Sequence, residues 1–386
     1  MRRTHRLTFV MAISCLLVTL SMIFALGLRA ADAAEPAADK KLIEWGWDEP
    51  DAAFLRANVQ RMEQLPFDGF VFHVVSDTGA NNLSWEVWGQ REFKRSDFQK
   101  SLADLQATTF RRLTHRFLRV NVTPGGIDWF DDAAWKVVLA NSGLSAQIAK
   151  ESGCKGFMFD VEQYEKDLFK FAGQAHKDKS FDEYRTQVRQ RGQEWIQAVN
   201  RQYPEITILL TFGYQIAQPR TERNEKDRSQ AHYGLLADFL DGVLTSCSNE
   251  TKIVDAWEHS YGYKRSEQFE KAYETIKTKA LEWTTTPDRY KKHVRAGFGI
   301  WMDYDWRKHG WDVENLSKNY SPPAAFEESA RAALRVSDEY VWVYTEQPRW
   351  WTNERLPKPY IDALERAAAS RRTATVPGQG PGESSR

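Results

Sequence analysis

The chain has 386 residues, which is long enough for one large domain or for two smaller ones. Its Lys+Arg and Asp+Glu counts are both 53, so no net charge would draw it to nucleic acid or to an anionic membrane surface. Binding must therefore depend on local groups.

The N-terminal segment has the order of a secretory signal. It begins MRRTHR, continues as an apolar run from about residue 7 to 28, and then reaches small residues at ADAA. This order predicts a signal peptide over 1–33 and a secreted or periplasmic protein. The apolar run is longer than in most signal peptides, so an uncleaved membrane anchor is the alternative.

Between a short linker at 34–41 and a Pro/Gly/Ser-rich tail at 371–386, which we expect to be disordered, strand-like runs alternate with helical patterns. Strands are expected at 42–47, 69–75, 116–123, 156–162, 207–213, 252–259, 295–303 and 340–346. Amphipathic helices are expected at 51–65, 132–151, 180–202, 229–246, 266–283, 323–338 and 358–370.

Strand then helix, repeated along residues 42–370 without a Pro/Gly-rich break, predicts one large α/β domain with the fold of a (β/α)8 TIM barrel. A doubly wound open sheet is the alternative. It is disfavoured because no glycine-rich phosphate-binding turn follows the first strand, and no strand carries a GxGxxG or GxxxxGK[ST] motif.

A barrel strand turns one row of side chains toward the helices and the other toward the barrel interior, which becomes polar near the C-terminal mouth. In all strands but the sixth, an apolar row alternates with a more polar row that we place in the interior. The groups expected at the interior mouth are Glu44, His73, Asn121, Asp160, Glu162, Thr211, Asp303, Tyr344 and Glu346. In the sixth strand Asp255 and Glu258 have opposite parity, so only one can point inward without a bulge.

The fourth strand carries the clearest chemical signal, GFMFDVEQY at 156–164. An apolar run typical of a buried strand ends in two carboxylates, Asp160 and Glu162, which share one face with Met158. Acids so close together cannot both ionise freely, so one should keep its proton to higher pH. With Trp-rich segments such as WGW at 45–47, they predict a carboxylate-rich cleft for a neutral, polyhydroxylated ligand.

Glycoside hydrolysis suits such a cleft, because it needs one carboxylic acid to protonate the leaving oxygen and a second carboxylate as nucleophile or base. Alternatively, a carboxylate positions the substrate's own amide. Glu162, nearest the mouth, is the expected general acid. Asp160, one layer deeper, would orient it, raise its pKa or stabilise a developing positive charge.

A second enzyme carboxylate would come from strands six to eight, where Glu258, Asp303 and Glu346 are the candidates. Glu258 ranks first because hydrogen-bonding side chains surround it in DAWEHSYGY. The other polar and aromatic side chains expected to bind substrate are Glu44, Trp47, His73, Asn121, Tyr164, Tyr214, Tyr261, Trp301, Asp303, Tyr344 and Glu346.

FDVEQY resembles the DxE end of the strand-four signature of family 18 glycoside hydrolases, the chitinase-like TIM barrels, and MDYD at 302–305 is similar to that family's MxYD. The resemblance implies that Glu162 is the acid/base and that Asp160 supports a substrate N-acetyl group acting as nucleophile. Lys155 and Met158 stand where the fuller signature has Asp. A non-catalytic carbohydrate-binding barrel is therefore the alternative function.

Other reaction classes find little support. The eight His form no HxH or HExxH motif for a metal, and no GxSxG motif for serine chemistry occurs. We expect no metal and no cofactor, a carbohydrate as the partner, no nucleic acid, and no membrane contact apart from the alternative anchor. Outside the leader, Cys154 and Cys247 could form a disulfide in an exported chain, although a domain of this size does not need one.

Overall fold

The computed structural model describes residues 39–371. The expected signal peptide at 1–33 therefore lies outside the described residues, as do most of the expected linker and nearly all of the expected tail. Within 39–371, no helix combines the length and the apolar character needed to cross a membrane.

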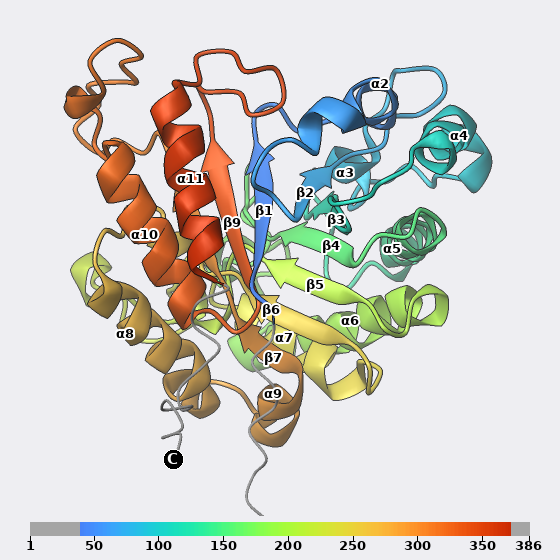
Figure 1. Ribbon diagram of the computed structural model, residues 1–386. Coiled ribbons are helices and arrows are strands. Elements are labelled where there is room, and N and C mark those ends of the chain that lie inside the picture. The colour runs from blue at the N-terminus through green and yellow to red at the C-terminus, as the bar shows by residue number, and fades with distance from the viewer. Residues whose placement is uncertain (1–38, 372–386) are drawn as a thin grey trace, which may run out of the picture. The chain divides into compact units, whose positions relative to one another are not determined.

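Parallel strands form a single sheet, and helices lie around its outside (Figure 1). The strands are β1 (Lys41–Gly46), β2 (Gly69–Phe72), β3 (His115–Asn121), β4 (Gly156–Asp160), β5 (Thr207–Leu210), β6 (Lys252–Asp255), β7 (Val294–Ala296), β8 (Phe298–Trp301) and β9 (Tyr340–Thr345). Their order in the sheet is β7-β6-β5-β4-β3-β2-β1-β9-β8, and the neighbouring strands pair in parallel.

Gly297 closes this sheet into a barrel. It is the single residue between β7, which pairs with β6, and β8, which pairs with β9, so the two ends of the sheet belong to one extended run. A Cβ atom at Gly297 would lie 2.8 Å from Val254 Cγ1 and 2.9 Å from the Tyr340 carbonyl oxygen, so this close approach requires glycine. The predicted (β/α)8 barrel is confirmed, and the described residues fall within one compact unit.

The predicted amphipathic segments form the main helices of the outer layer. These are α2 (Ala52–Met62), α5 (Asp132–Glu151), α6 (Phe181–Gln202), α7 (Leu236–Ser246), α8 (Ser266–Lys277), α10 (Pro323–Val336) and α11 (Lys358–Ser370). Helix α6 begins with a capping box, in which Ser180 Oγ accepts from the Glu183 backbone N–H at 3.2 Å and the Glu183 carboxylate accepts from the Ser180 N–H at 2.8 Å.

The sequence pattern did not predict α3 (Leu83–Glu86), α4 (Gln99–Ala107) or α9 (Pro287–His293). Helix α4 is short, but it buries Leu102 and Leu105 and is the longest helix between β2 and β3. Helix α7 begins at Leu236 rather than at residue 229.

Two apolar layers confirm the predicted alternation of side chains in most strands. The barrel interior is filled by Ile43, Trp45, Val71, Phe117, Met158, Leu209, Val254, Ala256, Tyr340 and Trp342. The outward row of each strand, for example Phe157, Phe159 and Val161 in strand four, belongs to the core beneath the helices. The first strand is the exception, because Ile43 and Trp45 point inward and Leu42 lies in the outer core.

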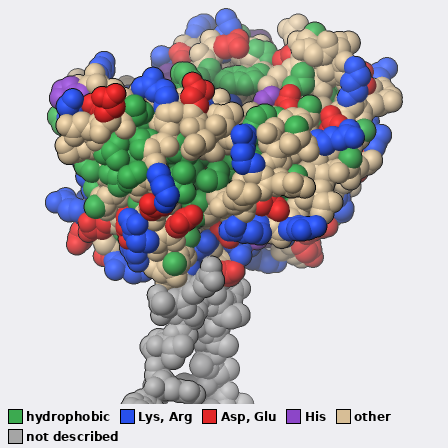
Figure 2. All heavy atoms as spheres, turned by 45° about the horizontal axis from the view of Figure 1, so that its top comes forward, with side chains coloured by type: hydrophobic (Ala, Val, Ile, Leu, Met, Phe, Trp, Pro, Cys, Tyr) green, Lys and Arg blue, Asp and Glu red, His purple; other side chains and the backbone are tan. Residues whose placement is uncertain are grey.

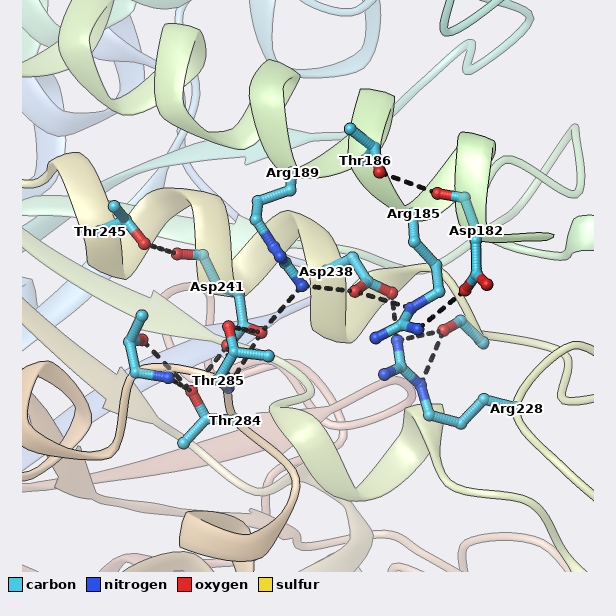
Figure 3. Close-up of polar contacts among 12 residues, drawn as sticks. Asp182, Arg185, Thr186, Arg189, Arg228, Asp238, Asp241, Thr245, Thr284 and Thr285 are labelled. Atoms are coloured by element: carbon cyan, nitrogen blue, oxygen red, sulfur yellow. Dashed lines mark hydrogen bonds and ion pairs between the residues drawn. The ribbon is translucent and has the colours of Figure 1, made fainter. Parts of the chain in front are cut away.

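A buried polar network joins α6 to α7 on the outside of the barrel (Figure 3). The fully buried Asp238 carboxylate accepts from Arg185 Nε at 3.2 Å and from Arg189 Nη2 at 3.1 Å, and it also pairs with Arg228. Three guanidinium groups thus compensate for the burial of one carboxylate, which fixes α7 against its neighbours.

Charged side chains of both signs are interspersed over the face shown in Figure 2, in keeping with the equal numbers of basic and acidic residues. Cys154 and Cys247 are both buried and free, so they do not form the disulfide that the sequence left open.

Candidate active site

A cleft of about 610 Å³ opens where the strands of the barrel end. Its lining comes from the C-terminal ends of the strands and from the segments that follow them: Trp45, Gly46, Trp47, Glu49, His73, Asn82, Trp85, Arg119, Glu162, Tyr164, Glu258, Tyr261, Trp301, Tyr344 and Glu346. This is the end of a TIM barrel at which catalytic groups gather.

The structure brings most of the predicted site residues to this cleft. Those that line it are Glu162, Glu258, Trp47, His73, Tyr164, Tyr261, Trp301, Tyr344 and Glu346. Asp160, Asn121 and Asp303 do not line the cleft but contact residues that do. Glu44 and Tyr214 lie elsewhere.

Asp160 lies beneath the cleft and is fully buried. Its Oδ2 accepts from the Tyr164 hydroxyl at 2.9 Å and from Arg119 Nη2 at 3.1 Å, and its Oδ1 accepts from the Glu162 backbone N–H at 3.1 Å. Burial, followed by the charge of Asp160, raises the pKa of Glu162. The predicted proximity of the two acids therefore perturbs Glu162 in the expected direction.

Glu258 lines the cleft from beyond the sixth strand: β6 ends at Asp255 rather than at residue 259, and Glu258 begins a short 3-10 helix, Glu258–Ser260. Its backbone N–H donates to the Thr211 carbonyl oxygen at 3.0 Å, which ties it to the segment after β5. Burial, followed by the charges of Glu162 and Asp160, raises the pKa of Glu258 well above its ordinary value. Asp255 lies between the sheet and the helices, so of the two acids that the sequence offered, Glu258 is the one at the cleft; it comes there by the turn at Trp257 and not by strand alternation.

Arg119 was missed as a site residue, although the alternation of the third strand places it in the interior. Its side chain is only 13% exposed and forms ion pairs with Asp160 at 3.1 Å and with Glu49 at 3.4 Å. The guanidinium also lies 5.1 Å from the ring centre of Trp45 and 4.4 Å from that of Trp85. Its positive charge therefore lies among acidic and aromatic side chains at the base of the cleft.

Glu49 follows β1 in a loop and had no periodic pattern to reveal it. Its carboxylate accepts from Trp45 Nε1 at 2.8 Å and lies 3.0 Å from His73 Nδ1. Burial opposes ionisation, but the Arg119 guanidinium and His73 outweigh it and hold the pKa of Glu49 below its ordinary value.

Aromatic side chains form much of the cleft surface. Trp47 is 65% exposed, and its indole N–H donates to the Tyr344 hydroxyl at 2.8 Å. Tyr344 stacks on Tyr261 with ring centres 5.3 Å apart, and Trp301 meets Tyr261 edge-on at 5.4 Å. These rings offer flat apolar faces with polar edges, as sugar rings require.

Asn121 and Asp303 do not line the cleft, but each accepts hydrogen bonds from residues that do. Asn121 Oδ1 accepts from Arg119 Nε at 2.8 Å. Asp303 accepts from Trp301 Nε1 at 2.8 Å and from the Glu346 backbone N–H at 3.0 Å, so it joins the end of β8 to the segment after β9.

The prediction for Glu44 was wrong. The register of β1 is opposite to the expected one, so Glu44 shares its side with Leu42 beneath the helical layer. There it is fully buried, and burial, followed by the charge of Asp48, raises the pKa of Glu44 well above its ordinary value. Asp48 in turn accepts from the Trp351 backbone N–H at 2.8 Å.

The prediction for Tyr214 was also wrong. After Gly213 the chain turns into a 3-10 helix, Tyr214–Ala217, which directs Tyr214 toward α7. Its hydroxyl donates to Asp241 Oδ1 at 2.8 Å in the outer layer.

No group of three or more His, Cys, Asp and Glu that could hold a metal ion occurs among residues 39–371.

No protein-family model matches the chain, and no curated protein sequence matches it. Solved structures resemble it at low identity. A glucosidase from Croceicoccus marinus is 9% identical, with 87% of this chain and 68% of that chain covered and a TM-score of 0.45. A GH5-4 broad specificity endoglucanase from an uncultured bacterium is 10% identical, with 83% and 86% covered and a TM-score of 0.45.

A sugar phosphate isomerase/epimerase from Parabacteroides distasonis is 11% identical, with 83% of this chain and 96% of that chain covered and a TM-score of 0.40. Likenesses at this level concern the fold, which proteins of different activity share.

Proposed function

We propose that the protein is a glycoside hydrolase that cleaves O-glycosidic bonds of an oligo- or polysaccharide by carboxylate acid/base catalysis. The observation that carries the proposal is that Glu162 and Glu258, two carboxyl groups with raised pKa values, line one aromatic cleft at the mouth of a barrel. Glycoside hydrolysis needs such a pair of acids on either side of the scissile bond.

The two glutamates share the available proton, because ionisation of one disfavours ionisation of the other. Glu162 is the general acid that the sequence predicts. One feature favours Glu258 as the group that keeps the proton: its pKa is the more strongly raised of the two. Whichever glutamate keeps the proton is the general acid, and the ionised glutamate of the pair acts as nucleophile or base.

A leaving-group experiment assigns these roles. Without the general acid, hydrolysis of an unactivated oligosaccharide should fall by about 10² to 10⁴-fold, whereas a nitrophenyl glycoside, whose leaving group needs no proton, should react nearly normally. Loss of the nucleophile or base should abolish both reactions. Glu162→Gln and Glu258→Gln should therefore differ, and equal retention of both activities in both variants would refute the assignment.

The geometry favours two enzyme carboxylates over the acetamido-assisted mechanism that the family 18 resemblance implies. Asp160 is held by Arg119 and Tyr164 rather than left free to turn toward a substrate group. Asp305, the last residue of the MDYD motif, is paired with Arg307 at 2.8 Å, and neither it nor Tyr304 lines the cleft. A substrate without an acetamido group should therefore be cleaved.

A non-catalytic carbohydrate-binding barrel is the alternative, since Lys155 and Met158 replace acids of the family 18 signature. A glycan array with product detection separates the two functions. New reducing ends support the hydrolase, and bound glycan without new reducing ends supports the binding protein.

We also propose that the protein is exported. The support is the basic, apolar and small-residue order of the expected signal peptide at 1–33. N-terminal sequencing of the protein from the periplasm or medium should find a chain that begins near residue 34. A full-length chain in the membrane fraction would support the uncleaved anchor instead.

A further inference from the structure

Asp255 is a buried acid that the proposed chemistry does not use. It is the last residue of β6 and lies on the row that faces the helices. Its side chain lines a cavity of about 10 Å³, together with Leu240 and Leu244 of α7 and Tyr290 of α9, and the residue is 3% exposed. Such a cavity has room for about one water molecule.

The Asp255 carboxylate contacts the backbone that leads into Glu258. Its Oδ1 accepts from the Trp257 backbone N–H at 3.3 Å. Trp257 has a φ of 39°, in the left-handed region that bulky residues rarely adopt. Such a conformation persists only where the surroundings hold it in place. Asp255 is one of the groups that hold it.

Two further contacts fix the same turn from other directions. The Ser260 hydroxyl donates to the Trp257 carbonyl oxygen at 2.6 Å, and the Glu258 N–H donates to the Thr211 carbonyl oxygen at 3.0 Å. Asp255 therefore holds the Trp257 amide, Ser260 holds the Trp257 carbonyl group, and Thr211 holds the next amide, that of Glu258. Each contact constrains the direction in which Glu258 enters the cleft.

Gly213 leaves the space that the Asp255 carboxylate occupies. A Cβ atom on Gly213 would lie 1.9 Å from Asp255 Oδ2. The φ of Gly213 is −97°, outside the left-handed region that favours glycine. Glycine is therefore needed at this position because a side chain would collide with the Asp255 carboxylate, and not because the backbone adopts a left-handed conformation.

We propose that Asp255 is a positioning residue for Glu258: its carboxyl group holds the Trp257 amide and so fixes the turn that directs Glu258 into the cleft. This inference rests on the proposed function, because it assigns Asp255 to the placement of one of the two catalytic acids.

The same contact should make the turn sensitive to pH. Burial raises the pKa of Asp255 to about 7, so its carboxyl group titrates near neutrality. The other titratable side chains that line the cavity are Tyr290 of α9, whose hydroxyl donates to the Ile276 carbonyl oxygen at 2.9 Å, and Tyr214 of the 3-10 helix, whose hydroxyl donates to Asp241 of α7 at 2.8 Å. The carboxylate form is the stronger acceptor for the Trp257 N–H, so the hold on the turn should tighten as pH rises through about 7.

A pair of substitutions separates positioning from general stability. Asp255→Leu removes the acceptor and fills the space, and it should lower kcat by about 10 to 100-fold with little change in KM, because Glu258 is displaced. Asp255→Asn keeps an acceptor and should restore much of that loss without the titration near pH 7. Leu244→Ala, which enlarges the same cavity without touching Trp257, should lower Tm but leave kcat per folded molecule unchanged.

Two readouts need no substrate, so they decide the inference even if the proposed function fails. With 15N-Trp labelling, the Trp257 amide signal, assigned with Trp257→Phe, should titrate near pH 7 in the parent and not in Asp255→Asn. A crystal structure of Asp255→Leu should show Glu258 displaced from the cleft. An unmoved Glu258 or a Trp257 amide that does not titrate would overturn the inference; if Asp255→Leu does not fold, the titration decides.

Discussion

The Arg119 guanidinium lies 3.1 Å from the Asp160 carboxylate beneath the cleft and compensates for the charge of an acid that is fully buried. The same cation pairs with Glu49 and lies against Trp45 and Trp85. It thus joins Glu49, in the loop after β1, and Asp160, at the end of β4, into one network under the candidate catalytic groups.

Arg119→Met should destabilise the protein strongly. Removing one partner of a buried ion pair leaves an uncompensated charge and costs about 3 to 5 kcal/mol of unfolding free energy. Denaturant unfolding of the variant measures this cost. The matched control is Arg335→Met, because Arg335 is 62% exposed and pairs with the exposed Glu270. Its effect should stay below about 1 kcal/mol, and equal losses in both variants would contradict a central role for Arg119.

Glu258→Gln should stabilise the protein at neutral pH. Because the pKa of Glu258 is raised in the folded state above its ordinary value of 4.5, the folded state binds the proton more tightly than the unfolded state. The contribution of Glu258 to the parent's stability is therefore fully present below pH 4.5 and is lost as pH rises through the folded pKa, whereas the Gln side chain does not ionise and loses nothing. The Tm of the variant should exceed that of the parent at pH 8, with the difference shrinking toward pH 4. A lower Tm at pH 8 would argue against a buried, destabilising carboxylate.

Trp47→Ala should weaken glycan binding without affecting the fold. Trp47 is 65% exposed and lines the cleft, so its loss should cost about 1 kcal/mol of binding, or roughly a five-fold higher Kd, with Tm nearly unchanged. Titration calorimetry with a glycan that binds in the array measures this. Trp306→Ala is the control, because Trp306 is 66% exposed but does not line the cleft. Equal effects of the two substitutions would place the binding surface elsewhere.

Gly299→Ala should destabilise the barrel interior. A Cβ atom on Gly299 would lie 2.6 Å from Cε2 of Trp342, whose indole is fully buried there. Overpacking of this kind costs about 1 to 3 kcal/mol. Gly126→Ala, whose added Cβ would meet only Lys166 Cγ at 3.9 Å, should be nearly neutral in the same thermal unfolding experiment. A neutral Gly299→Ala would show that the interior can readily rearrange around Trp342.

The barrel could be predicted from the sequence because most strands carry one apolar row and one mixed row, and because the long helices repeat at helical spacing. Helix α4 was not predicted because its apolar pattern is short, with Leu102 and Leu105 as its buried leucines. The inward and outward rows of the first strand were predicted the wrong way round, because its only acid, Glu44, was taken as an interior group. Its actual neighbours, Asp48 and Trp351, come from a loop and from the far end of the chain, and no local pattern reveals them.

The site was predictable where it depends on strand parity. Asp160 and Glu162 lie on the predicted side of strand four, and parity limited the sixth strand to a choice between Asp255 and Glu258. Glu49 could not be found in this way because it lies in a loop. The role of Arg119 depends on contacts with the loop after strand one and with the end of strand four, which only the closed barrel brings together.

The most direct measurement is hydrolysis of a mixed oligosaccharide panel in H2 18O, followed by mass spectrometry of the products. Hydrolysis by the parent should place one 18O atom at each new reducing end, and Glu162→Gln and Glu258→Gln should reduce this incorporation on unactivated substrates by at least about 10²-fold while both variants stay folded. Undiminished incorporation in either variant would contradict the assignment of these two carboxyl groups to the catalytic pair.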